Sequence, residues 1–221
     1  MDKNELSLKY MKEKNYEMAA KLLTEAIEEN KHDPVPYVNF GNLLFLLAEY
    51  DRAVNFYERA IELDNQTASA FYGKGNVLYQ KGRFIEAKDD FERALRLGLK
   101  DSDTHFMLGM CLIQLDQPLL ALPYLQRAVE LKEDDVEALF QYGLCLAQLE
   151  YYEDAAKYFQ KVIQLNSKHA DAYYNLGVVY YQFYNDDEKA LHYFEQALSI
   201  QEDHLLAGYG KKMIEKMKKD N

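Results

Sequence analysis

An octapeptide returns along this chain at a fixed step of 34 residues. The corresponding segments read YERAIELD at 57–64, FERALRLG at 91–98, LQRAVELK at 125–132 and FQKVIQLN at 159–166. A glycine recurs at the same step: Gly41, Gly75, Gly109, Gly143 and Gly177. No gap is needed until one extra residue appears near YNDDE. A period of this length indicates a repeat architecture, in which one small unit recurs and stacks on its neighbours.

Each unit predicts a pair of antiparallel helices. Its first half carries apolar residues at helical spacing, as in Tyr37 and Phe40. Its second half carries two small residues with a large residue between them, as in Ala53, Tyr57 and Ala60. A short break separates the halves, so a helix–turn–helix hairpin follows. One hairpin cannot bury its apolar faces alone, and the next hairpin must therefore stack on it.

The 34-residue step and the pattern of Leu-Gly followed by Ala-x-x-x-Phe-x-x-Ala resemble the tetratricopeptide repeat (TPR) family. The resemblance covers nearly the whole chain. It implies an all-α fold, a right-handed α-solenoid of six helix–turn–helix repeats with a C-terminal capping helix. The implied boundaries are 1–33, 34–67, 68–101, 102–135, 136–169 and 170–204 for the repeats, and 205–221 for the capping helix.

The chain departs from the family pattern at two kinds of place. The proline that the family commonly has between repeats is missing, so we expect the joints to run as more continuous helices. In the sixth repeat the inserted residue falls at YNDDEKA, where Asp186 or Asp187 is expected to cap the second helix.

Charge and hydropathy argue against nucleic-acid and membrane partners. The 221 residues carry a formal net charge of −11, and a field of that sign repels phosphate backbones and anionic lipids. The one basic run, KKMIEKMKKD at 211–220, favours a solvated last helix, with an RNA or lipid patch as the alternative. No window reaches the ~18 apolar residues of a membrane span, and no secretory signal opens the chain. We expect a soluble, cytoplasmic protein.

No group of residues predicts catalysis. The five histidines form no HExxH pair, and scattered surface histidines are favoured over a zinc site. The sequence has no phosphate loop and no GxSxG. Cys111 and Cys145 share one repeat position, which suggests either a redox pair or two small buried residues. The second interpretation is favoured, because stacked helices hold their Cα atoms beyond disulfide reach. We therefore expect no enzyme activity, no metal and no cofactor.

The resemblance also implies where a ligand binds. In the family, positions 2, 5, 9, 12 and 13 of each repeat look into the concave surface of the superhelix. From the second repeat to the sixth, the candidate groove residues are Val38, Asn42 and Phe45; Tyr72, Asn76, Tyr79 and Gln80; Asp103, Phe106, Met110 and Gln114; Glu137, Phe140, Leu144 and Gln148; and Asp171, Tyr174, Val178, Tyr181 and Gln182.

Three residue types recur in this set: an aromatic residue at position 5, a glutamine at position 13 and an acid at position 2. Amides can bond both polar groups of an extended backbone, aromatic rings give large contact areas, and acids favour Lys or Arg on the partner. Alternatives remain at each position. The rings can pack on the adjacent helix, the acids can serve the helix dipole, and the glutamines can be plain surface.

These features predict a non-catalytic scaffold or adaptor that binds a partner protein, as an extended peptide or helix with basic and apolar residues. The basic residues that some TPR proteins use to grip a C-terminal carboxylate are absent, so we expect no ligand of that kind. A self-associating module that forms a homo-oligomer is one alternative, and a regulatory subunit of an enzyme or RNA-processing complex is another. The sequence does not identify the partner, the pathway or the oligomeric state.

Overall fold

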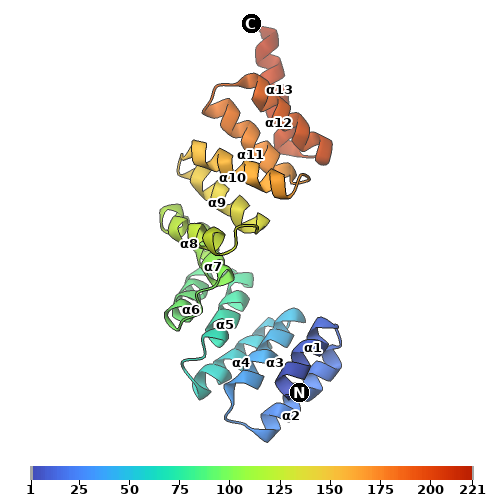
Figure 1. The fold of residues 1–221 in the computed structure, drawn as a ribbon, viewed down its shortest axis with the longest axis vertical. Helices are drawn as coiled ribbons and strands as arrows, with labels where there is room; N and C mark the ends of the chain where they lie inside the picture. Colours follow the sequence, from blue (N-terminus) through green and yellow to red (C-terminus); the bar gives the residue numbers. More distant parts are fainter. Residues whose placement is uncertain (1, 221) are drawn as a thin grey trace. The chain divides into compact units, whose positions relative to one another are not determined.

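The protein is all-helical (Figure 1). A computed structural model describes residues 2–220, with side chains to Lys218, and this part of the chain contains thirteen helices and no strand. The helices are α1 (Lys3–Lys12), α2 (Tyr16–Glu29), α3 (Pro34–Leu46), α4 (Tyr50–Leu63), α5 (Ala68–Gln80), α6 (Phe84–Arg96), α7 (Ser102–Gln114), α8 (Pro118–Leu131), α9 (Val136–Gln148), α10 (Tyr152–Leu165), α11 (Ala170–Gln182), α12 (Asp187–Ile200) and α13 (Leu205–Asp220).

The helices group into two compact units, Met1–Asp116 and Gln117–Asn221. The N-terminal unit holds α1 to α7, in which successive helices pack on one another. The C-terminal unit holds α8 to α13, again with each helix packed on the next. The boundary falls in the turn between α7 and α8, inside the fourth predicted repeat. Each predicted repeat range contains two helices, and α13 follows the sixth range.

In the hairpins that lie within one unit, one large side chain from the second helix fills the centre. In α4, Tyr57 is 1% exposed, and its ring lies where a Cβ on Gly41 would stand. In α12, Phe194 is 2% exposed and lies in the same way under Gly177. Burial of a ring of this size is the main stabilising contribution that each hairpin can make. The recurring glycine therefore provides the space that the recurring ring occupies.

The joints between hairpins break the helices, and the expectation of more continuous helices was wrong. The residues that end α2, α4, α10 and α12 have extended backbones: Asn30, Asp64, Asn166 and Gln201. A new helix then begins behind a capping side chain, as where Asp135 accepts a hydrogen bond from the backbone N–H of Ala138. Asparagine and aspartate end and restart helices here in place of proline.

The turns inside the hairpins place one residue in the left-handed region. Most of these residues are not glycine: Lys14, Ala48, Asp116, Glu150 and Asn185, with Gly82 as the exception. The extra residue of the sixth repeat lengthens the turn before α12. Asp186 there accepts a hydrogen bond from the backbone N–H of Lys189 at 3.0 Å, which confirms the predicted cap.

The last helix, α13, packs as one more first helix on the sixth hairpin (Figure 1). Ala207, Gly210 and Ile214 form its buried face against α12. On its other side the charged residues Lys212 and Glu215 are exposed. A polar outer face is what a terminal helix needs to end a stack of repeats in water.

Candidate functional site

Four exposed glutamines end the first helices of four repeats. Gln80 and Gln114 are the last residues of α5 and α7 in the N-terminal unit. Gln148 and Gln182 end α9 and α11 in the C-terminal unit. All four side chains are exposed. An amide carries both donors and an acceptor, so each of these side chains can bond either polar group of a peptide backbone.

The aromatic residues predicted at position 5 of the repeat pack against the hairpin core and are also partly exposed at the surface. The ring centroid of Tyr72 lies 5.7 Å from that of Phe91, and that of Tyr174 lies 5.9 Å from that of Phe194. Both tyrosines are half-buried, and so is Phe106. These three rings therefore support the core with one edge and offer the other to a ligand.

Two predicted groove residues are buried. Phe140 is 8% exposed, with its ring centroid 5.9 Å from that of Phe159 and 4.5 Å from that of His169. Val38 is 5% exposed. His169 is the last residue of the same repeat and caps α11, and its ring packs against that of Phe140. These two positions contribute packing beneath the groove and little contact area of their own.

The remaining predicted positions form a half-buried floor. Asn42 accepts a hydrogen bond at 2.7 Å from the hydroxyl of Tyr57, so one of its two polar groups is already engaged. The apolar members of the floor are all half-buried: Phe45, Tyr79, Met110, Leu144, Val178 and Tyr181.

Tyrosine hydroxyls and amides share hydrogen bonds within the N-terminal unit. Burial raises the pKa of Tyr72, and a hydrogen bond with Asn76 opposes that rise. Burial raises the pKa of Tyr79 in the same way, and a hydrogen bond with Gln114 opposes it. Both hydroxyls therefore stay protonated at neutral pH, and the α5–α7 surface presents neutral donors and acceptors.

The three predicted acids differ in what they contact. Asp103 is exposed near the start of α7. Glu137 is also exposed and accepts a hydrogen bond from Gln141 on the same helix. Asp171 has an oxygen 3.1 Å from Nε2 of His204, so a side chain of the protein itself already occupies it. Asp103 and Glu137 are the acids with the most freedom to meet a cationic partner.

His204 is a buried capping residue, and its interpretation as a scattered surface histidine was wrong. It is 6% exposed, and its Nδ1 accepts a hydrogen bond at 3.1 Å from the backbone N–H of Ala207. Nε2 therefore carries the proton that Asp171 accepts. The signal was present in the chain, because Asp101, Asp135 and His169 cap α7, α9 and α11 from the same position.

Sequence reasoning missed the start of the groove. Leu8, Met11, Lys12 and Leu46 line a hollow of about 290 Å³ on the N-terminal unit. The step of 34 residues would have found it, because Leu8 corresponds to Asn42 one repeat later. The predicted set, which begins with Val38, includes none of these four residues.

Sequence reasoning also treated α13 only as a cap, although it contributes to the groove. A cavity of about 270 Å³ lies between α11 and α13. From α11 it is lined by the predicted residues Tyr174, Val178, Tyr181 and Gln182, and from α13 by Leu206, Tyr209 and Met213. The hydroxyl of Tyr181 lies 3.6 Å from the sulfur of Met217. In the C-terminal unit the candidate site therefore includes residues of α13 beside the predicted residues of α11.

The two cysteines are buried free thiols, which fits their interpretation as small packing residues. Burial raises the pKa of Cys111 to about 12 and that of Cys145 to about 11. Both stay protonated at neutral pH, and a protonated thiol is a poor nucleophile and metal ligand. Between residues 2 and 220, no three His, Cys, Asp or Glu side chains gather as a metal site would require, and no helix is long and apolar enough to cross a bilayer.

Comparison with known proteins agrees with the helical hairpins. A family model described as tetratricopeptide repeat matches residues 66–134 and 134–203, and one described as TPR repeat matches 41–82. The chain belongs to the tetratricopeptide repeat family. The predicted all-α solenoid of paired helices is thereby confirmed.

One relative recurs in the sequence and structure comparisons. The TPR repeat-containing protein YrrB of Bacillus subtilis (strain 168) is 54% identical over 41 residues, which are 19% of this chain and 20% of YrrB. A crystal structure of YrrB, described as a TPR protein with an unusual peptide-binding site, is 51% identical with a TM-score of 0.81. That match covers 86% of this chain and 97% of the YrrB chain.

More distant structures share the fold alone. The pilF protein of Pseudomonas aeruginosa has a TM-score of 0.82 at 20% identity, over 96% of both chains. A MamA protein has a TM-score of 0.70 at 22% identity, covering 76% of this chain and 92% of its own. At this level of identity the likeness supports the helical arrangement and carries no argument about function.

Proposed function

We propose that this TPR protein is a non-catalytic adaptor that binds an extended peptide or helix of a partner protein along its first helices. The groove in the N-terminal unit runs over α1, α3, α5 and α7. In the C-terminal unit it runs over α9, α11 and α13. The proposal includes a cytoplasmic location.

The observation that carries the proposal is a pair of exposed glutamines beside half-buried apolar residues in each unit. Gln80 and Gln114 lie in one unit, and Gln148 and Gln182 in the other. Each glutamine is the last residue of a helix whose face toward the proposed groove is apolar. Amides satisfy the backbone of a ligand while the floor takes its side chains, which is how a peptide without regular structure is held. The likeness to YrrB, which has a peptide-binding site, supports the same reading.

The chemistry of the floor and rim describes the partner. Tyr72 and Tyr174 offer rings with polar edges, and the cavity between α11 and α13 can take one large apolar side chain. Asp103 and Glu137 favour a neighbouring Lys or Arg. We therefore propose a ligand segment in which apolar residues alternate with basic ones.

A capture experiment with matched variants tests this function. Gln80→Ala with Gln114→Ala and, separately, Gln148→Ala with Gln182→Ala alter only exposed side chains. The control, Gln126→Ala with Gln160→Ala, removes two exposed amides from the second helices α8 and α10. Each protein is used to capture partners from extracts of the native host, and the partner found is then titrated by calorimetry.

We expect both groove variants to bind the partner at least about tenfold more weakly, since each loses two peptide hydrogen bonds. The control should bind as the unaltered protein does. Equal affinity in all three variants, with helicity intact, would exclude the groove. Turnover of a substrate by the purified chain would exclude the non-catalytic role.

A further inference from the structure

An exposed aromatic cluster lies outside the groove, at the hairpin turns of the fifth and sixth repeats. Tyr151 is 50% exposed, Phe183 46% and Tyr184 42%. The ring centroids of Tyr152 and Phe183 are 5.5 Å apart, which joins the α9–α10 turn to the α11–α12 turn. Those of Phe183 and Tyr184 are 4.9 Å apart. We call these four residues the aromatic edge.

Carboxylates surround the aromatic edge. Glu150, Glu153, Asp187 and Glu188 belong to the same two turns and the helix starts that follow. Within residues 2–220 none of the four forms an ion pair, because the nearby Lys157 and Lys189 pair with Asp154 and Asp186 instead.

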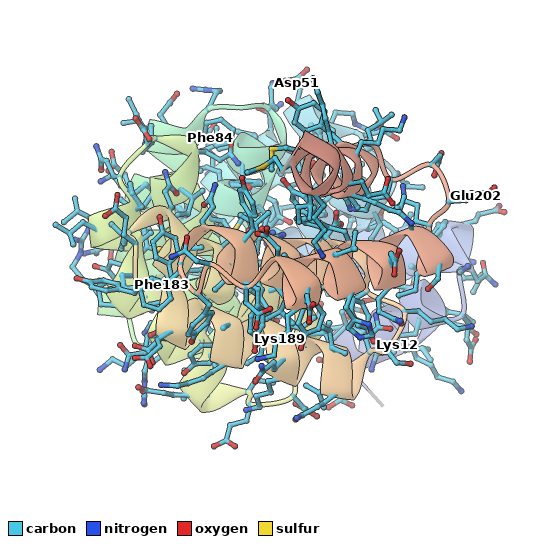
Figure 2. The ribbon with its side chains drawn as sticks, turned by 90° about the horizontal axis from the view of Figure 1, so that it is seen from above. Lys12, Asp51, Phe84, Phe183, Lys189 and Glu202 are labelled. Atoms are coloured by element: carbon cyan, nitrogen blue, oxygen red, sulfur yellow. The ribbon has the colours of Figure 1, made fainter. Side chains whose placement is uncertain are left out.

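A cation already lies on a ring beside this edge. The amino group of Lys189 is 5.1 Å from the ring centroid of Tyr180, and the ring centroid of Tyr180 is 5.0 Å from that of Tyr184. Figure 2 marks Phe183 and Lys189, which flank the α11–α12 turn. Aromatic faces and carboxylates both attract cations, so this surface suits a partner that is apolar and positively charged.

The chain itself carries a surface of that chemistry on α13. Six exposed residues of α13 fall on one side of the helix at 100° per residue, and we call them the terminal face: Leu205, Leu206, Tyr209, Lys212, Lys216 and Met217. Glu215 and Lys218 are exposed outside this face. Leu205 is 86% exposed and Tyr209 72%. Lys212, Lys216 and Met217 of this face belong to the one basic run, 211–220, of a chain whose net charge is −11.

We propose that the terminal face of one copy of this protein docks on the aromatic edge of a second copy. The apolar residues of α13 cover the exposed rings, and Lys212 and Lys216 meet the carboxylates around them. The two surfaces are different patches of one molecule, so the contact is heterologous, and each copy offers one of each. Leu206 and Tyr209 also line the cavity between α11 and α13, so docking and peptide binding share these two side chains. Lys212 and Lys216 are not among the residues that line this cavity, so their charges can be changed without altering its lining.

Sedimentation equilibrium of the full chain over a wide concentration range tests the proposal. The terminal variant is Lys212→Glu with Lys216→Glu, and the edge variant is Glu150→Lys with Glu188→Lys. Two controls change the same number of charges at other exposed positions: Lys31→Glu with Lys168→Glu, and Glu28→Lys with Glu133→Lys. Circular dichroism of every variant establishes that the helices are retained.

We expect the average mass of the unaltered protein to rise with concentration. The terminal and edge variants should each lower the association constant by about tenfold or more, because like charges then face each other. A mixture of these two variants should associate again, because the reversed charges are complementary between them. The controls should associate as the unaltered protein does.

Three results would overturn the inference. They are a monomer at every concentration, a terminal variant that associates as strongly as its control, and a mixture of the two variants that stays monomeric. The groove variant Gln148→Ala with Gln182→Ala separates this contact from peptide binding. It should associate normally even where it fails to bind a partner peptide.

Discussion

At the scale of single residues, the contact between Tyr57 and Gly73 is the tightest constraint in the N-terminal unit. A Cβ added to Gly73 would stand 2.3 Å from Cε1 of Tyr57, a ring with 1% exposure. We expect Gly73→Ala to lower the free energy of unfolding by about 1–3 kcal/mol, as overpacking in a fixed core does. Urea denaturation followed by circular dichroism measures it.

The same contact provides its own controls. Tyr57→Leu removes the atoms that collide and should recover part of the stability of Gly73→Ala in the double variant. Gly208→Ala tests glycine replacement without a collision, because its Cβ would meet nothing nearer than an atom of Leu198 at 3.9 Å. If Gly73→Ala were as stable as Gly208→Ala, the packing described here would be incorrect.

Asp90 makes the stability of the third repeat depend on pH. It is 9% exposed, and burial raises its pKa from an ordinary value of 3.8 to about 6, although Lys74 at 3.4 Å opposes the rise. The folded state then holds this proton more tightly than the unfolded chain does. The contribution of Asp90 to stability is therefore greatest below about pH 4 and falls as pH rises through about 6.

Asp90→Asn removes this titration, and the comparison across pH is the test. The stability of the variant minus that of the unaltered protein should increase between pH 4 and pH 7, by on the order of 2 kcal/mol. Asp89→Asn, which changes the neighbouring exposed carboxylate, should show a much smaller change. A flat difference for Asp90→Asn across this range would mean that the carboxyl group is ionised in the fold at acid pH as well.

At the scale of the helical hairpin, the pair Lys74 and Asp90 replaces an aromatic pair. The second repeat has Phe40 stacked on Phe56 at the equivalent positions, with ring centroids 4.4 Å apart. The fifth repeat has Tyr142 against Tyr158 at 4.7 Å. In the third repeat the same space holds an ion pair, and Oδ2 of Asp90 lacks a hydrogen bond within the described chain.

We expect Lys74→Phe with Asp90→Phe to raise the free energy of unfolding by about 1–4 kcal/mol, because a desolvated ion pair gives way to stacked rings. Lys74→Ala alone should destabilise, since it leaves the buried carboxylate without its cation. Equilibrium denaturation at pH 7 measures both. A double variant less stable than the unaltered protein would show that the ion pair contributes more than the rings would.

The turn inside each hairpin allows a second prediction at this scale. Ala48 has φ of 58°, whereas Gly82 occupies the same turn position with φ of 71°. The left-handed region strains alanine, and glycine relieves that strain at some cost in chain entropy. Ala48→Gly should therefore stabilise by about 0.5–1 kcal/mol, and Gly82→Ala should destabilise. Nothing lies within 4 Å of a Cβ on Gly82, so the thermal shift of that variant isolates the backbone effect.

At the scale of the whole molecule, a local period was enough to predict most of the helices. The recurring glycine and the ring that packs on it predict the two helices of a hairpin, because this contact joins residues that are close in the sequence. The break in the helices at Asn30 was not predicted, because no proline stands between the repeats to indicate where a helix ends. The burial of Phe140 follows the alternative in which a ring at position 5 packs on a neighbouring element, here against His169, which caps α11.

The groove was predicted less completely than the fold, for a related reason. The position of Gln80 within its repeat predicted an exposed amide, because helix ends are exposed in every unit. Tyr209 was left out of the candidate set, although it follows Tyr174 by the repeat step plus the inserted residue and lines the same cavity. Where a residue's surroundings come from its own hairpin, sequence predicts them, and where they come from the next element, it does not.

A substitution that destabilises one hairpin of this repeat protein should increase amide hydrogen exchange mainly near that hairpin. Within each unit the helices pack mainly on their neighbours along the chain, so destabilisation should spread to adjacent helices and weaken with distance. Gly73→Ala should increase amide hydrogen exchange in α4, α5 and α6 and leave α11 to α13 protected.

His204→Ala removes the buried cap of α13 and should give the opposite pattern. Amide hydrogen exchange should increase in α11 to α13, and the amides of α1 to α4 should stay protected. Exchange measured by mass spectrometry on both variants gives the two patterns. If each substitution raised exchange evenly from α1 to α13, the chain would unfold as one cooperative body, and the nearest-neighbour account of its stability would be wrong.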